Sequence, residues 1–400
     1  MGPLAGLRVL DMTSVLMGPH ATQILGDYGA EVTKVEPPAG DMIRQIGPAR
    51  RAGMGPLFLN TNRSKQSITL DLKTEGGHAA LIRLIAQADI LVTNIRPKAM
   101  GRLGLGYEAL QEINPSLIYA SLVGFDQRGP YAARPAYDDL IQGGACISHC
   151  FVRAGQAPAY VPAAVADRIV GFAAVNAILS AVIERQTSGA GQKVEIPMFE
   201  TMVSMILSDH LGGLTYEPPL DKGGYARQLS PERRPYRTKD GYICALIYSD
   251  DHWRRFFNAI GRPLTPETDP RFADFTARMA HIDEVYSELG QILLTRTTDE
   301  WLVLLEEADV PAMPMHSFES ILQDPHLAAT GFFETVEHPS VGRIRSMAVP
   351  VRFSRSQPAP CRLAPRQGEN GAEVLSDAGL SDEEIAALAE SGALRLPEQA

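Results

Sequence analysis

The chain lacks several features that mark large classes of protein. Its 400 residues include four cysteines, no run of eighteen apolar residues, and no basic segment followed by an apolar stretch at the start. We therefore expect neither a transmembrane helix nor a secretory signal. So few cysteines are typical of a reducing compartment, which predicts a cytoplasmic protein. The formal net charge of −10 argues against a nucleic-acid or membrane partner.

The cysteines also offer little for a metal. Cys146 and Cys150 flank His149, but a zinc site needs a second ligand pair at comparable spacing and none follows. We expect no metal, and we interpret these two residues, with Cys244 and Cys361, as small buried side chains.

The common motifs of nucleotide and hydrolase chemistry are missing too. The loop at Val15–Pro19 has one glycine where a dinucleotide site has G-x-G-x-x-G, and neither G-x-x-x-x-G-K-[ST] nor G-x-S-x-G occurs. These absences disfavour a Rossmann-type oxidoreductase and an ordinary serine hydrolase.

A regular alternation of strands and helices fills the first half of the chain. The expected strands are Arg8–Met12, Glu31–Glu36, Ser67–Leu72, Ile90–Ile95, Leu117–Val123 and Lys193–Ile196. Helices are expected from Pro19 to Gly29 and over Ala79–Ala88, and Gly171–Ile183 is apolar on nearly every side, which predicts a buried helix. The pattern indicates an α/β fold with a Rossmann-like, mostly parallel sheet covered by helices on both faces.

The second half differs in kind, and the length suggests two domains. Residues 215–235 are rich in proline, glycine and arginine, which indicates a domain boundary. A hairpin turning at Asp240–Gly241 and helices over 250–310 are expected next. A second hairpin should pair Phe333–Glu337 with Arg343–Phe353, and a capping box at Ser381 should open a last helix.

Two functional hypotheses come from local patterns. Six basic residues at strand and loop ends either converge on one sheet edge to hold a phosphate-bearing ligand or are separate surface charges. They are Arg63, Lys65, Lys73, Arg96, Lys98 and Arg102. Asp167 stands before an apolar segment, where it is either a helix N-cap or a nucleophile; the local pattern favours the cap.

Short motifs in a fixed order run along the chain. They include Leu16-Met17-Gly18-Pro19, Gly29-Ala30-Glu31-Val32, Arg63-Ser64-Lys65-Gln66-Ser67, Leu70-Asp71-Leu72-Lys73, Asn94-Ile95-Arg96-Pro97, Gly129-Pro130-Tyr131, Tyr137-Asp138, Gly189-Ala190-Gly191, His338-Pro339 and Gly368-Glu369-Asn370. Together they resemble the class III CoA-transferases of the formyl-CoA and carnitine type, over essentially the whole chain. The resemblance implies the class III fold: a large CoA-binding α/β domain (1–215) to which segment 330–400 returns, a smaller α+β domain (225–325), and an interlocked homodimer.

The resemblance also implies a site. Asp167 falls on the family's catalytic aspartate, which moves CoA from an acyl-CoA donor to a small carboxylic acid through an aspartyl anhydride and an aspartyl-CoA thioester. Coenzyme A thus enters as substrate. The residues matching CoA contacts are Leu16, Met17, Leu70, Lys73, Asn94, Ile95, Arg96, Arg102, Tyr137 and Asp138.

Some positions depart from the family pattern. Pro37 stands where some members have an arginine, which leaves the adenine contact open, and Gly223–Gly224 is a short counterpart of a glycine-rich loop that covers the site. The related α-methylacyl-CoA racemases have a histidine about thirty residues before the aspartate, whereas this chain has Tyr137 there. A phenol exchanges α-protons poorly at neutral pH, so racemase activity is disfavoured.

Two questions stay open at this point. A non-catalytic CoA-binding protein is a further alternative, because binding and catalytic residues are separable. Arg227, Arg233 and Arg234, near the expected domain junction, either bind a dicarboxylate or are linker charges.

Overall fold

The structure, a computed structural model, describes residues 2–263 and 268–397. The chain forms two compact units. Unit 1 consists of Met1–Ala145, Val161–Ser204 and His326–Ala400, and unit 2 of Cys146–Tyr160 and Met205–Pro325. The domain limits expected at 1–215, 225–325 and 330–400 stay a prediction, and residues 264–267 and 398–400 of those ranges lie outside the described part.

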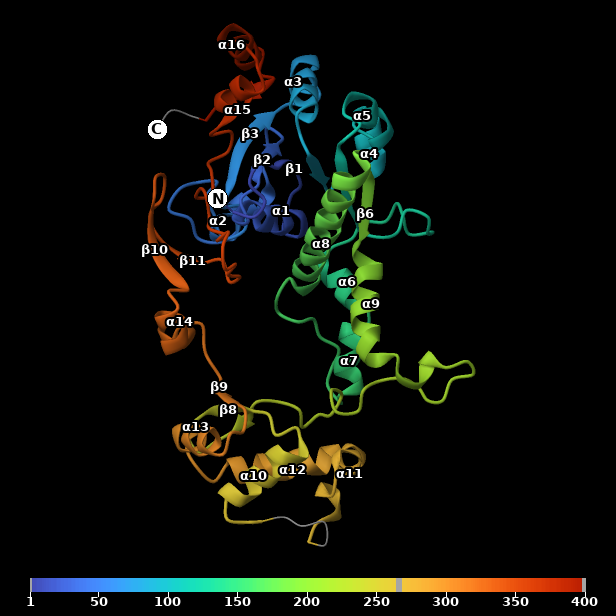
Figure 1. Cartoon of the computed structure of the whole chain (residues 1–400), viewed down its shortest axis with the longest axis vertical. Helices are drawn as coiled ribbons and strands as arrows, with labels where there is room; N and C mark the ends of the chain where they lie inside the picture. Colours follow the sequence, from blue (N-terminus) through green and yellow to red (C-terminus); the bar gives the residue numbers. More distant parts are fainter. Residues whose placement is uncertain (1, 264–267, 398–400) are drawn as a thin grey trace. The chain divides into compact units, whose positions relative to one another are not determined.

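A seven-stranded sheet forms the centre of unit 1 (Figure 1). Its order is β12-β3-β2-β1-β4-β5-β6, and all neighbours are parallel except β12 and β3. The strands are β1 (Arg8–Met12), β2 (Glu31–Glu36), β3 (Lys65–Leu70), β4 (Ile90–Thr93), β5 (Ile118–Val123), β6 (Lys193–Pro197) and β12 (Leu394–Arg395). The α/β fold with a mostly parallel sheet is confirmed, although β3 begins and ends two residues before the expected strand.

Helices cover both faces of this sheet, as the alternation along β1 shows. Leu10 and Met12 join an apolar cluster that includes side chains of α3, α5, α15 and α16. Asp11 lies between them and faces the other side, where Thr22 Oγ1 of α1 donates to its Oδ2 at 2.7 Å. The helices are α1 (Met17–Asp27), α3 (Glu75–Ile85), α5 (Tyr107–Ile113), α15 (Gly371–Asp377) and α16 (Asp382–Glu390).

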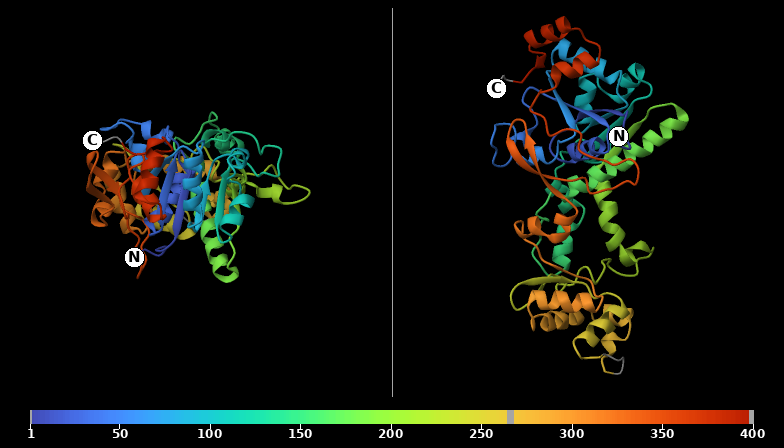
Figure 2. Two further views of the ribbon diagram at one scale, coloured as in Figure 1. Left: turned by 90° about the horizontal axis from the view of Figure 1, so that it is seen from above. Right: turned by 60° about the vertical axis from the view of Figure 1, so that its left-hand side comes forward.

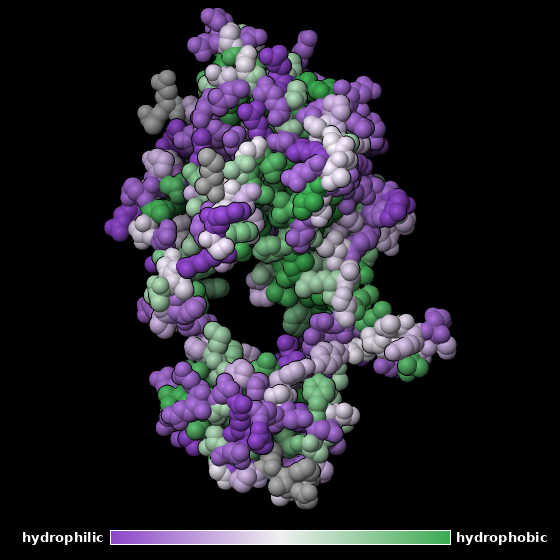
Figure 3. Space-filling model, viewed as in Figure 1, coloured by the Kyte–Doolittle hydropathy of each residue, from purple (hydrophilic) through white to green (hydrophobic). Residues whose placement is uncertain are grey.

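The long helix α8 (Val165–Ser188) packs against α1, β5 and β6 (Figure 2). It ends at Gly189, whose φ of +74° gives the left-handed C-terminal turn that glycine favours. The expected full burial is wrong, because Phe172 and Ile183 are 57% and 65% exposed. Figure 3 shows apolar side chains over this helix. Within the described residues, α8 alone has the length and composition of a membrane span, and its packing on α1 accounts for its apolar stripe.

Unit 2 has its own core. Large buried side chains, among them Trp253, Phe256 and Trp301, pack between helices and a small antiparallel sheet. The elements are β7 (Tyr236–Arg237), β8 (Tyr242–Ala245), β9 (Ala312–Pro314), α7 (Ile147–Arg153), α10 (Asp250–Ala259), α11 (Phe275–Ala280), α12 (Ile282–Leu293) and α13 (Thr298–Glu307). The hairpin at Asp240–Gly241 is confirmed, closed by the bond from Thr238 N–H to the Gly241 carbonyl at 3.0 Å.

The C-terminal segment completes unit 1. Strands β10 (Phe333–His338) and β11 (Gly342–Met347) form the expected antiparallel hairpin, with β11 shorter than expected. The capping box at Ser381 is confirmed at the start of α16. Strand β12 then pairs with β3, so the end of the chain forms one edge of the main sheet.

Candidate active site

A cavity of about 220 Å³ opens at the carboxyl ends of β1, β4 and β5 in unit 1. Its lining comes from the loops that follow these three strands, from the segment leading into α6 (Asp138–Gly144), and from the first turn of α8. The lining residues are Ser14, Val15, Met17, Asn94, Ile95, Arg96, Pro97, Leu122, Val123, Gly124, Gln127, Ala132, Arg134, Pro135, Ala136, Tyr137, Asp167 and Met198.

The strand order explains this location. The chain builds the sheet outward from β1 through β2 to β3, then returns to the other side of β1 with β4 and β5. The loops after β1 and β4 therefore leave the sheet in opposite directions, which opens a crevice at the carboxyl ends of these strands. Ligands of open α/β sheets bind at such a switch point.

The side chain of Asn94 joins the two sides of this crevice through hydrogen bonds. Its Oδ1 accepts from Ser14 N–H at 3.1 Å, and its Nδ2 donates to the Ser14 carbonyl at 2.8 Å. The loop after β1 is held further by Val15, whose φ of +69° is in the left-handed region and whose N–H donates to Asp41 Oδ1 at 3.2 Å. The loop that lines the cavity is thus fixed through its backbone.

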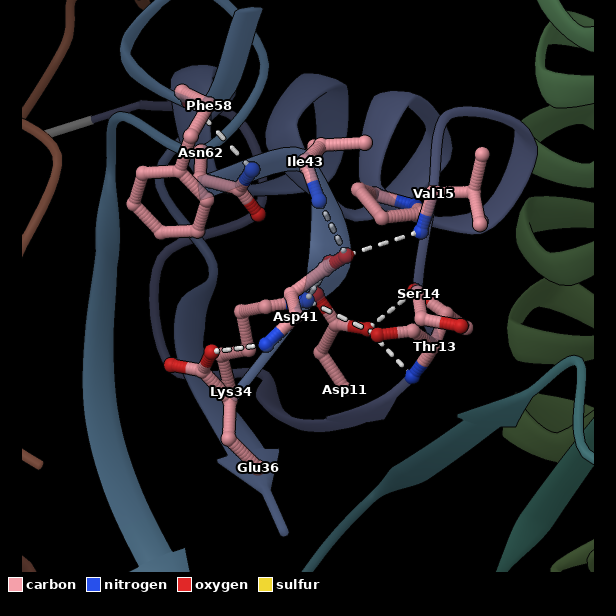
Figure 4. Close-up of polar contacts among 12 residues, drawn as sticks. Asp11, Thr13, Ser14, Val15, Lys34, Glu36, Asp41, Ile43, Phe58 and Asn62 are labelled. Atoms are coloured by element: carbon pink, nitrogen blue, oxygen red, sulfur yellow. Dashed lines mark hydrogen bonds and ion pairs between the residues drawn. The ribbon is translucent and has the colours of Figure 1, made fainter. Parts of the chain in front are cut away.

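A buried ionic network lies beneath that loop (Figure 4). Lys34 Nζ donates to the Thr13 carbonyl at 2.8 Å and lies 3.0 Å from Asp41 Oδ2. Lys65 Nζ contacts Asp11 Oδ2 at 2.9 Å. Burial alone would raise the pKa of Asp11, but Lys65 and Lys34 outweigh it and hold that pKa well below its usual range. The network joins β1, β2 and β3 to the turn that enters the site.

Asp167 lies in the first turn of α8 and not at its cap. The helix begins at Val165 after Ala164, so the expected N-cap role of Asp167 is wrong. The capping acceptor comes from another helix: Asp138 Oδ1 accepts from the Asp167 N–H at 2.9 Å and satisfies one of the free donors of the helix end. Gln142 Nε2 donates to Asp138 Oδ2 at 2.5 Å, which fixes this carboxylate.

A close approach of two helices brings Asp167 to the cavity. One turn later on α8, Gly171 lies against the start of α1, where a Cβ would stand 3.0 Å from the Met17 carbonyl oxygen. A larger side chain there would push α8 away. Glycine at this position therefore lets Asp167 and Met17 line the same space.

The carboxyl group of Asp167 is tuned by its surroundings. Burial, and then the like charge of Asp138, raise its pKa from 3.8 to about 6, against the opposing effect of Arg168. A helix N-terminus favours the ionised form of a carboxyl group, but burial outweighs this effect, so the group is mostly ionised only above about pH 6. At neutral pH the group is still mostly a carboxylate, and it is a stronger base than an ordinary aspartate. Such a perturbed acid in a cleft is typical of a functional site.

The structure brings together six of the residues singled out from the sequence. Asp167, Met17, Asn94, Ile95, Arg96 and Tyr137 line one cavity. Leu16 and Leu70 are buried in apolar clusters, and Lys73 and Arg102 are exposed outside the cavity. Asp138 is not among the lining residues, but its carboxylate accepts a hydrogen bond from the Asp167 N–H. The expected contacts of all ten binding residues with CoA stay a prediction.

The hypothesis of one basic cluster is wrong in part. Arg63 is paired with Asp27 at 2.8 Å and Lys65 with Asp11, and both cations are buried. They lie before and at the start of β3, whereas Lys73 follows its end. Of the six basic residues, only Arg96 lines the cavity.

The expected burial of the cysteines is also wrong. Cys146, Cys244 and Cys361 are exposed, Cys150 is half-buried, and all four are free thiols. Cys146 is the N-cap residue before α7 and has a φ of +71°. Cys244 lies on the exposed face of β8, and its neighbour Ile243 lies on the core face. Within residues 2–263 and 268–397, no group of three or more histidine, cysteine, aspartate or glutamate side chains is placed to hold a metal.

Three polar lining residues were not among the candidate site residues: Ser14, Gln127 and Arg134. Gln127 Nε2 donates to the Phe125 carbonyl at 2.8 Å, and the Arg134 guanidinium stacks on Tyr131 at 3.9 Å. Their neighbours Gly129-Pro130-Tyr131 were part of the resemblance, so that motif was the available signal. Its role is to shape the segment that closes this side of the cavity.

Comparison with known proteins agrees with this geometry. The family model described as CoA-transferase family III matches residues 4–371. The chain is 34% identical to succinate–glutarate CoA-transferase of Agrobacterium fabrum, covering 94% of this chain and 95% of the relative. It is 31% identical to formyl-CoA:oxalate CoA-transferase of Escherichia coli, covering 98% and 99%. A CAIB/BAIF family crystal structure from Brucella suis superposes with a TM-score of 0.79 at 31% identity, covering 94% and 99%.

The match spans both units and includes the loops that line the cavity. Enzymes of this family use CoA thioesters as substrates, so the interpretation as a non-catalytic binding protein is wrong. The chain belongs to CoA-transferase family III and is a CoA-transferase.

Proposed function

We propose that this enzyme moves CoA from an acyl-CoA donor to a small carboxylic acid, with Asp167 as the nucleophile. The observation that carries the proposal is the position of Asp167: a carboxyl group with a raised pKa lies in a cavity at the switch point of the sheet. A carboxylate suits this chemistry because it can itself become an activated acyl group, which preserves the energy of the thioester through each step.

The reaction proceeds through four exchanges at Asp167. Its carboxylate oxygen attacks the thioester carbon, the C–S bond breaks, and CoA leaves as thiolate from a mixed anhydride. The thiolate attacks the aspartyl carbon and expels the donor acid, which leaves an aspartyl-CoA thioester. The acceptor carboxylate then displaces CoA to form a second anhydride. Finally the thiolate attacks the acceptor acyl carbon, which releases the new acyl-CoA and the free carboxylate of Asp167.

The remaining cavity residues would hold the CoA chain along the sheet edge. Arg96 is exposed and lines the cavity, and its guanidinium would bind a phosphate of the ligand. Lys73 follows β3, three strand spacings from β4 in the sheet order, or about 14 Å. An extended ligand could therefore reach from the Asp167 cavity to Lys73, which supports both residues as CoA contacts.

Asp167→Asn tests the proposal directly. Turnover should fall at least about 10³-fold because the amide is not a nucleophile, while binding of CoA is retained. Asp139→Asn, an exposed neighbour on α6, serves as the matched control and should keep its activity. Racemisation and thioester hydrolysis are followed in the same assays.

Trapping identifies the intermediate. Wild-type enzyme incubated with acyl-CoA and hydroxylamine should acquire a hydroxamate at Asp167, read by peptide mass spectrometry. An active preparation in which Asp167 stays unmodified would contradict the mechanism. Racemisation of a 2-methylacyl-CoA without transfer would favour the racemase alternative over this one.

We further propose that the enzyme works in the cytoplasm as an interlocked homodimer. The exposed apolar side chains of α8, Phe172 and Ile183, support a partner chain on that helix. Free, exposed thiols such as Cys244 suit a reducing compartment.

A further inference from the structure

Unit 2 contains a second cavity, of about 490 Å³, beside its small sheet. All its lining residues belong to unit 2, and none of them lines the Asp167 cavity. They are Arg227, Arg233, Arg234, Pro235, Tyr236, Cys244, Ala245, Leu246, Ile247, Tyr286, Pro311, Ala312 and Met313. The volume is in the range of small-molecule sites.

The floor of this cavity is apolar because the sheet has one uncovered face. Along β8, Ile243 points into the core of unit 2, so its neighbour Cys244 points to the other side. Cys244 is opposite Met313 of β9 in the pairing register, and Met313 is 62% exposed. Proline, alanine and leucine side chains of the lining extend this surface. It offers a hydrocarbon chain an apolar contact and few polar partners.

Three arginines are among the residues that line this cavity: Arg227, Arg233 and Arg234. Arg227 Nε donates to the phenol oxygen of Tyr286 at 2.9 Å, and its guanidinium lies 4.9 Å from the centre of the Tyr248 ring. Both partners are tyrosines, and within residues 2–263 and 268–397 no carboxylate forms an ion pair with Arg227, so its charge is uncompensated there. Arg234 is paired with Glu232 at 2.8 Å.

Arg233 adds a second uncompensated charge. It is exposed, and the described residues provide it with no ion pair or side-chain hydrogen bond. Three cations thus share one carboxylate, in a chain whose formal net charge is −10. A local excess of positive charge beside an apolar surface draws anions to this part of the molecule.

We propose that the cavity binds an aliphatic carboxylate, with the carboxylate on Arg227 and Arg233 and the chain on the apolar floor. Arginine binds a carboxylate through two parallel N–H···O bonds. A second charge at the far end of the ligand would have to lose water against Met313 and Pro311, so a monocarboxylate fits better than a dicarboxylate. The site thereby goes beyond the Asp167 chemistry and does not rest on the proposed function.

Calorimetric titration of the purified full-length enzyme tests the proposal. Octanoate is the probe, and adipate, inorganic phosphate and adenosine 3′,5′-bisphosphate are the comparisons. Octanoate should bind at one site per chain and more tightly than adipate. Arg233→Ala should weaken octanoate at least about tenfold, the loss of a charge-assisted contact. Arg237→Ala, an exposed arginine on β7 outside the lining, is the control and should bind like wild type.

Two further variants are titrated with octanoate in the same way. Met313→Asp places a negative charge on the floor and should abolish octanoate binding, with thermal melting used to confirm folding. Asp167→Asn should bind octanoate normally, which separates this site from the proposed catalytic one. The proposal would be overturned if wild-type enzyme does not bind octanoate, or if Arg233→Ala and Met313→Asp both bind it unchanged. Tighter binding of the bisphosphate or of phosphate at these arginines would also overturn it.

Discussion

The side chain of Asp167 lines a cavity, and its carboxyl group is partly removed from water. Its pKa of about 6 places the loss of the proton just below neutral pH. In the proposed role as nucleophile, Asp167 must be ionised to attack. The structure therefore links a pH dependence of the rate to the packing of α8 against α6, since Asp138 contributes to the raised value.

The first prediction concerns the pH profile of the wild-type enzyme. The acid limb of kcat/KM for acyl-CoA should have an apparent pKa of about 6, with the rate falling tenfold per pH unit below it. Steady-state rates between pH 4.5 and 8 measure this. A limb near 4, the value of an ordinary aspartate, would show that Asp167 is not the titrating nucleophile.

Asp138→Asn separates charge from hydrogen bonding at the same residue. The amide oxygen can still accept from the Asp167 N–H, but the like charge that raises the pKa of Asp167 is removed. The acid limb should move to lower pH, by up to about one unit, with a small loss of stability of about 1 kcal/mol. Asp139→Asn should leave the limb in place. An unchanged limb in Asp138→Asn would assign the raised pKa to burial alone.

The raised pKa of Asp167 also lowers the free energy of unfolding at neutral pH. Because the pKa of Asp167 is higher in the folded chain than in an unfolded one, the folded state binds the proton more readily between about pH 4 and 6. Its destabilising contribution is present at neutral pH and is relieved as the pH falls through about 6. Asp167→Asn should thus raise the free energy of unfolding at pH 7 by about 1–3 kcal/mol, and should lose this advantage at pH 4, as urea titrations would show. Equal effects at both pH values would contradict this account.

Among the elements, the loop between β1 and α1 is held partly by buried charged groups. It is short, it carries a strained residue at Val15, and its backbone is held by Lys34, Asp41 and Asn94. Lys34 and Asp41 come from β2 and the loop after it, and Asn94 follows β4, so the shape of the loop depends on the order of the strands. The ionic network pairs charged side chains that are buried beside the sheet.

Lys34→Met tests this role. The variant leaves Asp41 and Asp11 short of a cation in the interior, which should lower the free energy of unfolding by about 3–5 kcal/mol. It should also raise KM for acyl-CoA, because the Thr13 carbonyl loses its donor and the loop loosens. Lys98→Met, at an exposed position of α4 (Pro97–Arg102), should change stability by less than about 0.5 kcal/mol. Similar stabilities for the two variants would refute the structural role of Lys34.

At the scale of the molecule, α8 combines two surfaces. One stripe packs on α1 and the sheet, and the other leaves Phe172 and Ile183 in solvent. We expect these exposed apolar side chains to belong to the proposed interaction surface. The proposed homodimer would cover them.

Ile183→Asp is the corresponding test. A buried carboxylate in the interface should shift the enzyme from dimer to monomer, read by light scattering after gel filtration at micromolar concentration. Val303→Asp, an equally exposed apolar position on α13, is the comparison and should leave the mass unchanged. A wild-type monomer, or a dimer that persists in Ile183→Asp, would contradict this use of α8.

Much of the fold could be predicted because its signals are local. Strands β1 and β2 have the bounds expected from their apolar runs, the hairpin turns at Asp240–Gly241, and the capping box opens at Ser381. Each of these depends on residues within a few positions of one another. The family motifs are local as well, so the resemblance, the α/β class and the transferase activity followed from the sequence.

Tertiary structure decided what the charged residues do. From the sequence, Arg63 and Lys65 were either ligand-binding cations or surface charges, yet they pair with Asp27 and Asp11, 36 and 54 positions away. Asp167 patterns as a cap, yet its N–H is capped by Asp138, 29 positions earlier. Strand order and helix packing determine which side chains become neighbours. Burial then determines how strongly the charged neighbours interact. The sequence by itself determined the elements and the chemistry available; only the folded chain determined which carboxylate was left free at the cavity.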